Sequence, residues 1–223
     1  MNYDVFTTLK VQNSRPLFFD AHHQRLFTQA EKLHIKRPRL TAKDTTEYLI
    51  SQKLTSCALK ITLSHTTGLE FAARPLPVPA PNPISLITVP DTRNELKVYK
   101  TTDRQVCVEA KKLAEKEGSQ DALFVTNGNI IESTICNVFS MNDRGELITP
   151  DVESLGLAGI MRQIIMEHLP VLVQNIPATT DGPIVLVNSL RVTRADRLDG
   201  KKLRDGSRLL EKIKKVVQSA ENN

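Results

Sequence analysis

The sequence predicts a mixed fold, α+β or α/β, built as two domains. Stretches with the two-residue alternation of strands and stretches with the helical period of about 3.6 residues follow each other along the whole chain. The run 75–83 holds five prolines in nine residues, which can neither join a central sheet nor continue a helix, so we interpret it as a linker. Asn127-Gly128 is a strong hairpin signal in the second part. We therefore expect a small N-terminal α+β domain over residues 1–88 and a larger, β-rich domain with flanking helices over residues 89–223.

The first domain is expected to hold two helices among its strands. Asp20 is predicted to cap the first helix, which runs to about Leu33 and carries Arg25 in its second turn. The second helix is predicted over residues 41–53. Strands are predicted over residues 3–11, 16–19, 58–64, 69–75 and 84–89, with turns near Asn13 and Gly68.

The second domain is predicted to be richer in strands. Helices are expected over residues 102–117, ending at Gly118, over 159–168, opening at Gly159, and over 207–218. Strands are predicted over residues 122–126, 130–132, 137–141, 146–149, 171–176, 184–187 and 190–193. The last helix carries one apolar stripe against lysines and glutamates, which indicates packing on its own domain rather than on a membrane or a partner.

Composition narrows the classes of function. The chain has 223 residues, of which 40% are hydrophobic, so it can bury the core of a self-sufficient globular enzyme. The basic residues are scattered, with a net charge of +5, and tryptophan is absent, which favours a small anionic ligand over nucleic acid. The three cysteines lie far apart without a Cys-x-x-Cys spacing, which argues against disulfides and against a metal site. Because we find neither a signal peptide nor an apolar membrane span, we expect a soluble, cytoplasmic protein with no membrane partner.

Four segments carry residues that suit chemistry. Arg25 lies beside apolar neighbours on a helix and needs an anionic partner such as a phosphate. Lys100 lies at an expected strand-to-helix junction, where a desolvated amine can attack a carbonyl or carry a proton. Glu132 interrupts a strand-like run, and a carboxylate there is costly unless it meets a cation or a donor. Gly159 precedes helical amides that suit an anion, and its missing side chain would let a phosphate approach. Each segment alone also fits an ordinary role: a surface salt bridge, an exposed lysine, an edge-strand glutamate or a helix cap.

Taken together, in order and spacing, these segments resemble the class IV aminotransferases. The matching motifs span nearly the whole chain and are H-x-x-R-L, K-x-x-x-R, G-x-I-x-E-x-x-x-x-N-V-F, T-P and L-x-G-I-x-R. The family includes branched-chain aminotransferase, D-amino-acid aminotransferase and aminodeoxychorismate lyase. The resemblance implies a two-domain enzyme of fold type IV with pyridoxal phosphate (PLP) as its cofactor.

The resemblance also implies roles for single residues. Lys100 would be the catalytic residue, because it would hold PLP as a Schiff base and, once released by substrate, shuttle the proton. Glu132 would pair with the protonated pyridine nitrogen, which keeps the ring an electron sink. Arg25 and the backbone amides of Ile160 and Met161 would hold the cofactor phosphate.

Local features resemble the aminodeoxychorismate lyases more than the transaminases. Met161 stands where transaminases usually have threonine, and the run VNSLR resembles a segment common in the lyases. Within this run, Ser189 stands where relatives often carry a phosphate-binding threonine or serine. Arg104, Asn188 and Arg191 are candidates for binding two substrate carboxylates. We therefore expect a lyase of folate biosynthesis that converts 4-amino-4-deoxychorismate to p-aminobenzoate and pyruvate.

Three other functions stay open at this point. An amino-acid transaminase of the branched-chain or D-amino-acid type would need a keto acid for turnover. A catalytically silent homologue would have no chemical need for Lys100 and Glu132 together. A basic nucleic-acid-binding module would bind DNA or RNA in a salt-sensitive way and would carry no chromophore. Family members are generally homodimers, so the resemblance also implies a homodimer.

Overall fold

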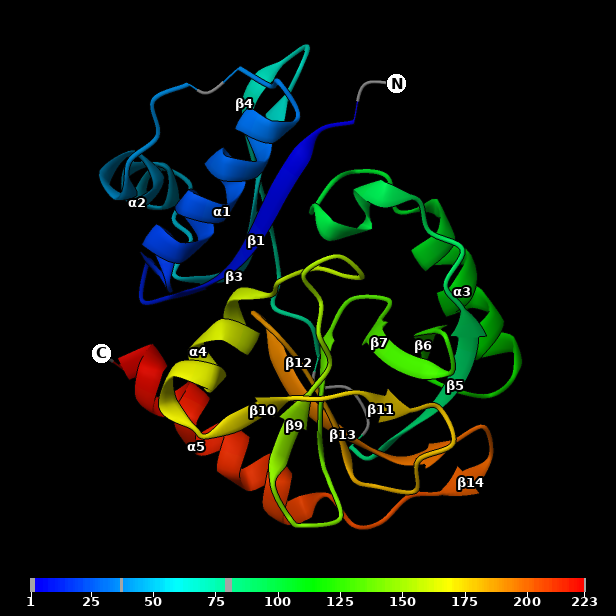
Figure 1. The fold of residues 1–223 in the computed structure, drawn as a ribbon. Helices are drawn as coiled ribbons and strands as arrows, with labels where there is room; N and C mark the ends of the chain where they lie inside the picture. Colours follow the sequence, from blue (N-terminus) through cyan, green and yellow to red (C-terminus); the bar gives the residue numbers. More distant parts are fainter. Residues whose placement is uncertain (1–2, 37, 79–81, 223) are drawn as a thin grey trace. The chain divides into compact units, whose positions relative to one another are not determined.

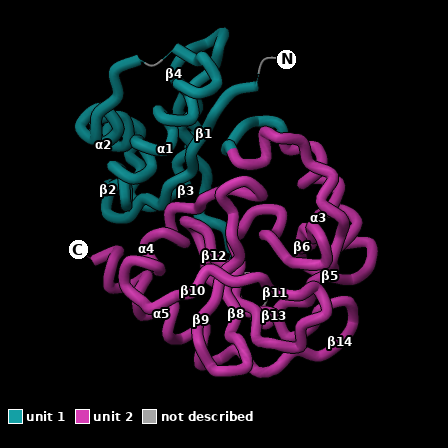
Figure 2. Tube along the Cα trace, viewed as in Figure 1, with its two compact units in different colours: residues 1–78, 99–103 teal, residues 79–98, 104–223 magenta. Residues whose placement is uncertain are grey.

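The computed structural model describes residues 3–36, 38–78 and 82–222 (Figure 1). Helices and strands are mixed along the described chain, so the predicted fold class is confirmed. Two compact units are visible in Figure 2, one formed by residues 1–78 and 99–103 and the other by residues 79–98 and 104–223.

This division differs from the expected boundary after residue 88 in two places. Strand β5 (Ile84–Pro90) belongs to the second unit, because it pairs with strands of that unit on both sides. The short segment around Lys100 belongs to the first unit, although it was expected in the second domain. Lys100 therefore belongs to the same unit as the N-terminal sheet.

The first unit is a four-stranded antiparallel sheet with two helices. Its sheet has the order β2-β1-β3-β4, and α1 packs on β1. Alternate residues of β1 are buried, which follows the alternation in the sequence and sends Val5, Leu9 and Val11 into the core. The elements are β1 (Val5–Gln12), β2 (Arg15–Pro16), α1 (Phe19–Lys32), α2 (Ala42–Ser51), β3 (Ser56–Ser64) and β4 (Gly68–Arg74).

Residues 99–103 are joined to β1 by backbone pairing. Thr101 forms an antiparallel bridge with Val5, and the N–H of Phe6 donates to the carbonyl of Lys100 at 2.9 Å. Helix α3 (Gln105–Lys116) consequently begins at Gln105 rather than at residue 102, because the preceding backbone groups are already used.

The second unit is a β-barrel with helices on its outer face. The path β8-β12-β13-β5-β6-β7 is closed into a ring by a pairing between β7 and β8. Helix α3 packs on β5 and β6, α4 packs on β12, and α5 packs on β13 and α4. The further elements are η1 (Glu95–Val98), β6 (Asp121–Thr126), β7 (Asn129–Ser133), β8 (Asn137–Met141), β9 (Leu147–Thr149), α4 (Ile160–His168), β10 (Val171–Val173), β11 (Ile176–Pro177), β12 (Ile184–Asn188), β13 (Arg191–Leu198), β14 (Lys201–Lys202) and α5 (Ser207–Asn222).

Apolar side chains from alternate positions of the strands fill the inside of this barrel. Leu86, Leu123 and Leu186 are among those that are completely buried. Burial of a side chain of this size contributes about 1.5–3 kcal/mol. Residues at the intervening positions, such as Phe124 and Val187, therefore lie on the outer face, under the helices.

Local signals predicted some elements correctly and others wrongly. The hairpin at Asn127-Gly128 is confirmed, with both residues at positive φ, 50° and 75°. The residue that precedes α1 is Phe18, in a left-handed conformation at φ 53°, so Asp20 lies in the first turn and the strand predicted over 16–19 ends at Pro16. An acidic residue is also favoured in a first turn by the helix dipole, which is why the two positions are easily confused.

The buried strand predicted over residues 171–176 is wrong as well. The structure has two short strands there, β10 beside β9 and β11 beside β7. Leu172 and Val173 are 46% and 52% exposed, because β10 lies at the edge of the sheet. An apolar run alone could not reveal this edge position.

Buried Arg162 connects the T-P and L-x-G-I-x-R motifs. It lies in α4, and its Nε donates to Oγ1 of Thr149 at 3.2 Å while its Nη2 donates to the carbonyl of Pro150 at 2.9 Å. Thr149 in turn donates to the carbonyl of Val138 in β8 at 2.8 Å. The arginine therefore fixes the start of α4 against the barrel.

Arg162→Met is expected to lower the free energy of unfolding by about 2–3 kcal/mol, because it leaves buried acceptors without their charged donor. Urea denaturation of the full chain measures this. Arg197→Met is the matched control: Arg197 is exposed and donates to the carbonyl of Gly200, and its loss should change stability by no more than about 0.5 kcal/mol. Equal losses in the two variants would contradict the anchoring role of Arg162.

Candidate active site

Lys100 is fixed by its backbone in the first unit. Its N–H donates to Oε1 of the buried Gln29 in α1 at 3.0 Å, and its carbonyl accepts from Phe6 in β1. Its Nζ lies 5.0 Å from the centroid of the Phe6 ring. One helix and one strand therefore fix the backbone from which the amine extends.

Arg25 lies in the same unit and is linked to a buried histidine. Its Nη2 donates to Oγ1 of Thr7 at 3.0 Å, and the Thr7 oxygen lies 2.6 Å from Nδ1 of His22. Thr7 accepts from the arginine, and its own hydrogen is available to a neutral His22 at Nδ1. Burial and the charges of Arg25 and Lys100 lower the pKa of His22 well below its usual value.

This cluster is positively charged. Burial lowers the pKa of Arg25 to about 10, so the guanidinium stays protonated at neutral pH. Nε of Arg25 and Nε2 of His22 are buried and have no hydrogen-bond partner among the described residues. A group of this charge suits an anion.

Glu132 lies where the barrel closes in the second unit. It stands opposite Asn137 in the pairing of β7 with β8 and opposite Phe124 in β6, on the outer face of the barrel. The register of β6 and β7 shifts beside this point and leaves Ile131 as an extra residue, a β-bulge. The bulge explains why a carboxylate can follow two isoleucines without entering the apolar interior.

The carboxylate of Glu132 accepts hydrogen bonds from three residues. Nη1 of Arg93 donates to it at 2.6 Å, the N–H of Leu157 lies 3.2 Å from both oxygens, and Nδ2 of Asn137 donates at 3.4 Å. All these groups are donors, which favours the ionised form of the carboxylate. Burial raises the pKa of Glu132, and the guanidinium of Arg93 opposes this rise.

The sequence predicts a cation or a donor beside Glu132 but does not show which residue provides it. The cation is Arg93, whose other donors form a fork to Asp91, Nε to Oδ1 at 2.9 Å and Nη2 to Oδ2 at 3.0 Å. Nζ of Lys97 also donates to Asp91, at 3.1 Å. Although burial opposes the shift, the bonds from Arg93 and Lys97 lower the pKa of Asp91. The pattern Asp-x-Arg after β5 was the only local sign of this arginine, and the contact of Arg93 with Glu132 is seen only in the fold.

Asn137 explains why a glycine precedes α4. Its Nδ2 donates to the carbonyl of Leu157 at 2.9 Å, and its Oδ1 would lie 2.0 Å from a Cβ built on Gly159. A side chain at Gly159 would overlap Asn137, which is one reason for the glycine. Close approach of a phosphate to this glycine stays a prediction. Gly159 is the N-cap of α4, as predicted, so the first-turn amides, including those of Ile160 and Met161, have no intrahelical carbonyl to bind.

Gly159→Ala is expected to cost about 1–3 kcal/mol, because the new methyl group overlaps the Asn137 amide. The double variant Gly159→Ala/Asn137→Ala should lose less stability than the sum of the two single changes, since the overlap is then absent. Chemical denaturation of the four proteins of this cycle measures the difference. Additive losses would show that the two residues do not compete for the same space.

Arg104, a substrate-binding candidate, lies beside the turn that follows Glu132. Its Nη2 donates to the carbonyl of Thr134, and its charge acts on the Glu132 carboxylate. Thr134 is itself held by a hydrogen bond of 2.5 Å to Asp121. The structure therefore groups Arg104 with Glu132 and Arg93.

The other predicted residues of the second unit lie on the hairpin between β12 and β13. Ser189 is a half-buried turn residue. Oδ1 of Asn188 accepts from the N–H groups of Leu190 and Arg191 at 2.9 and 3.1 Å, which organises the turn itself. The register places Asn188 and Arg191 on the inner face of the barrel, opposite to Glu132, so the structure does not group them with that carboxylate.

Cys136 lies beside this hairpin and is not suited to be a nucleophile. Burial raises its pKa to about 12, and Nδ2 of Asn188 lies 3.2 Å from its sulfur. The described residues contain no group of three or more His, Cys, Asp or Glu side chains placed to bind a metal ion. In the same ranges, the helices lack the length and hydrophobicity needed to span a bilayer.

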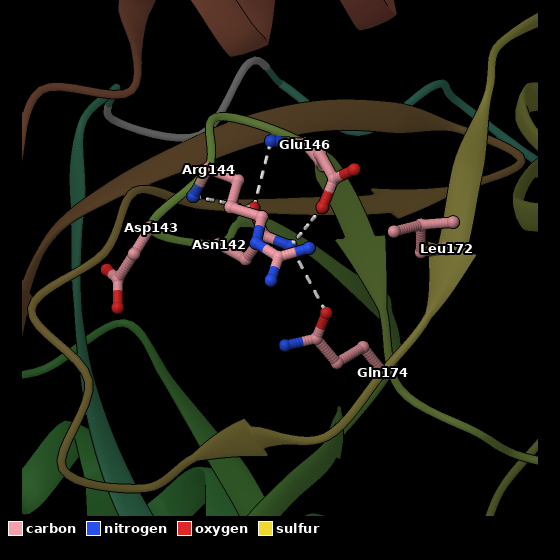
Figure 3. A pocket seen from close by; sticks show the side chains of 6 residues that line it. All are labelled: Asn142, Asp143, Arg144, Glu146, Leu172 and Gln174. Atoms are coloured by element: carbon pink, nitrogen blue, oxygen red, sulfur yellow. Dashed lines mark hydrogen bonds between the residues drawn. The ribbon is translucent and has the colours of Figure 1, made fainter.

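A hollow of about 480 Å³ lies elsewhere on the second unit and contains none of the predicted residues (Figure 3). The side chain of Asn142 binds other residues that line the hollow. Its Oδ1 accepts from the N–H groups of Arg144 and Glu146, and its Nδ2 donates to the side chains of Glu146 and Gln174. These polar groups hold the turn between β8 and β9, so we assign no ligand to the hollow.

The lowered pKa of His22 gives a pH dependence of stability. Because the unfolded chain takes up a proton that folded His22 resists, the free energy of unfolding should fall as pH drops below about 6.5. His22→Gln should remove this part of the dependence. Urea unfolding of both proteins at about pH 7.5 and 5.5 measures it. If both lose the same amount of stability between the two pH values, His22 is not held neutral in the fold.

Comparison with known proteins identifies relatives of the whole chain. The sequence matches the family model of the class IV aminotransferases over residues 4–188. Among solved structures, a Legionella pneumophila protein provisionally described as 4-amino-4-deoxychorismate lyase is 24% identical, with a TM-score of 0.87 over 99% of this chain and 92% of its own.

Two further structures share the fold at lower identity. The PLP-bound form of a hypothetical aminotransferase from Mycobacterium tuberculosis is 22% identical, with a TM-score of 0.83 over 98% of this chain and 88% of that chain. The branched-chain amino acid aminotransferase from Escherichia coli is 18% identical, with a TM-score of 0.80 over 96% of this chain and 83% of its own. The fold predicted from the motifs is thus confirmed.

Proposed function

The chain belongs to the class IV aminotransferase family and is a PLP-dependent enzyme, and on this basis we propose that it is a lyase that converts 4-amino-4-deoxychorismate to p-aminobenzoate and pyruvate. The family sets the cofactor, and the choice of reaction is our inference. The support comes from the residues that surround Lys100 and Glu132.

The residues present fit PLP. The cofactor needs an amine for its aldehyde, a cation for its phosphate and a carboxylate for its protonated ring nitrogen. Lys100, Arg25 and Glu132 offer these three groups, and the donors around Glu132 favour its ionised form. We propose that the first-turn amides of Ile160 and Met161, with the hydroxyl of Ser189, add donors to the phosphate.

PLP supplies, when bound, an aldehyde that condenses with an amine and a ring that accepts an electron pair from the neighbouring carbon. In our proposal, the 4-amino group of the substrate would replace Lys100 on the bound cofactor. The released Lys100 would remove the proton from C4 of the substrate ring. The bond from the ring to the enolpyruvyl oxygen would then break as the ring becomes aromatic, and Lys100 would return the proton to the leaving enolpyruvate to give pyruvate. Lys100 would finally take the cofactor back, which would release p-aminobenzoate. The products together hold all atoms of the substrate, so no keto acid is consumed.

The observation that carries the lyase assignment is the combination of Met161 with the sequence of the β12–β13 turn, since both resemble the lyases more than the transaminases. In our proposal, Arg104, held by the Thr134 carbonyl beside Glu132, supplies positive charge for a substrate carboxylate. A transaminase could use this arginine for an α-carboxylate, so Arg104 alone does not decide between the two reactions. The alternative is a branched-chain or D-amino-acid transaminase, which would need an amino acid and a keto acid together.

The PLP-loaded protein should release p-aminobenzoate and pyruvate from 4-amino-4-deoxychorismate without any keto acid. Lys100→Ala should lower this rate by at least about 1,000-fold and remove the visible absorption band of the bound cofactor. Lys60→Ala is the matched control, because Nζ of Lys60 also lies over the Phe6 ring, at 4.5 Å. It should keep both the band and most of the activity.

Two results would count against the proposal. Turnover that appears only with an amino acid and a keto acid would identify a transaminase. No p-aminobenzoate from a protein that shows the cofactor band would leave the family assignment intact and refute the lyase. We further propose a homodimer that acts on its small anionic substrate in the cytoplasm, and light scattering of the PLP-loaded protein tests its mass.

A further inference from the structure

Glu132 is the last member of a buried row of alternating charges formed by Lys97, Asp91, Arg93 and Glu132. Lys97 contacts Asp91, Asp91 contacts Arg93, and Arg93 contacts Glu132, at 3.1, 2.9 and 2.6 Å respectively. The side chains of Arg93 and Glu132 are each 7% exposed, and that of Asp91 is completely buried. Ion pairs as buried as these lose most of their hydration.

The guanidinium of Arg93 binds two carboxylates at once. Two of its nitrogens form a fork to Asp91, and the third nitrogen is directed to Glu132. Its guanidinium carbon lies 4.0 Å from the centroid of the Phe124 ring, which adds a cation–π contact on one face. A planar guanidinium can serve both carboxylates at once, whereas a lysine has one charged nitrogen for two partners.

Stability alone does not explain this row. A buried ion pair is often no more stable than apolar residues of the same volume, because the cost of desolvation matches the attraction. The row also ends at the carboxylate that the proposed function assigns to the cofactor ring, and Gly156 leaves room for it, since a Cβ there would lie 2.9 Å from the Glu132 carboxylate. These facts point to a role in setting the state of Glu132.

We propose that Arg93 is a positioning residue that keeps Glu132 ionised and oriented, so that the ring nitrogen of bound PLP stays protonated. The inference rests on the proposed function, in which Glu132 faces that nitrogen. One proton is shared between a carboxylate and a pyridine nitrogen. A guanidinium bound to the carboxylate favours the state with the negative charge on Glu132 and the proton on nitrogen. Without it, burial favours the neutral carboxyl, and the ring loses its positive charge.

The test uses PLP labelled with ¹⁵N in its ring, bound to the full chain, because the ¹⁵N chemical shift reports whether that nitrogen carries a proton. At neutral pH, the wild type should show the protonated position. Arg93→Gln should move the signal toward that of neutral pyridine. Arg194→Gln is the matched control, since it removes an arginine–carboxylate pair with Asp205 elsewhere on the barrel and should leave the signal unchanged.

Glu132→Gln separates failure of this inference from failure of the proposed function. It should move the signal fully to the neutral position. If it does not, Glu132 does not face the ring nitrogen and the proposed site is wrong. If Glu132→Gln moves the signal and Arg93→Gln does not, only the role of Arg93 is refuted.

Arg93→Lys decides the matter if Arg93→Gln does not fold. It keeps a positive charge but cannot hold both carboxylates, so its signal should lie between those of the wild type and Glu132→Gln. A signal identical to the wild type would overturn the proposal. Because the readout is the state of the ring nitrogen, a loss of stability alone would not produce the expected shift.

Discussion

The pairing of Glu132 with Asn137 is the constraint on which the second unit depends. These two residues close the barrel, and both side chains reach the outer face, where α4 begins. Asn137 binds the Leu157 carbonyl and fills the space that Gly159 leaves, while Leu157 donates back to Glu132. The strand pairing, the helix start and the orientation of the carboxylate are therefore one arrangement, and a change in any of them alters the others.

The first unit includes Lys100, although the chain before this lysine belongs to the second unit. Lys100 lies far in sequence from β1 and α1, yet its backbone is paired with Phe6 and Gln29. Arg25 is set by Thr7 from the same strand. The backbone of Lys100 and the side chain of Arg25 are thereby fixed within one unit, which suits the proposed site, where they would hold the two ends of one cofactor.

Turns and helix starts could be predicted from the sequence, because neighbouring residues determine them. Contacts between residues far apart in the sequence could not. The Asn127-Gly128 turn and the glycine before α4 carry their own signals, and both are present in the structure. Arg93 could not be matched to Glu132, because the residues lie 39 positions apart and meet through a β-bulge. The grouping of Lys100 with the N-terminal sheet was missed for the same reason, since long-range backbone pairing leaves no local pattern.

The proposed function depends first on Lys100 as the residue that would bind PLP covalently. Reduction of the PLP-loaded protein with borohydride, followed by digestion and mass spectrometry, tests it directly, because reduction makes the bond between lysine and cofactor permanent. We expect the pyridoxyl group on the peptide that contains Lys100 and on no other lysine. A label on Lys60 or Lys97, or a spread over several exposed lysines, would contradict it.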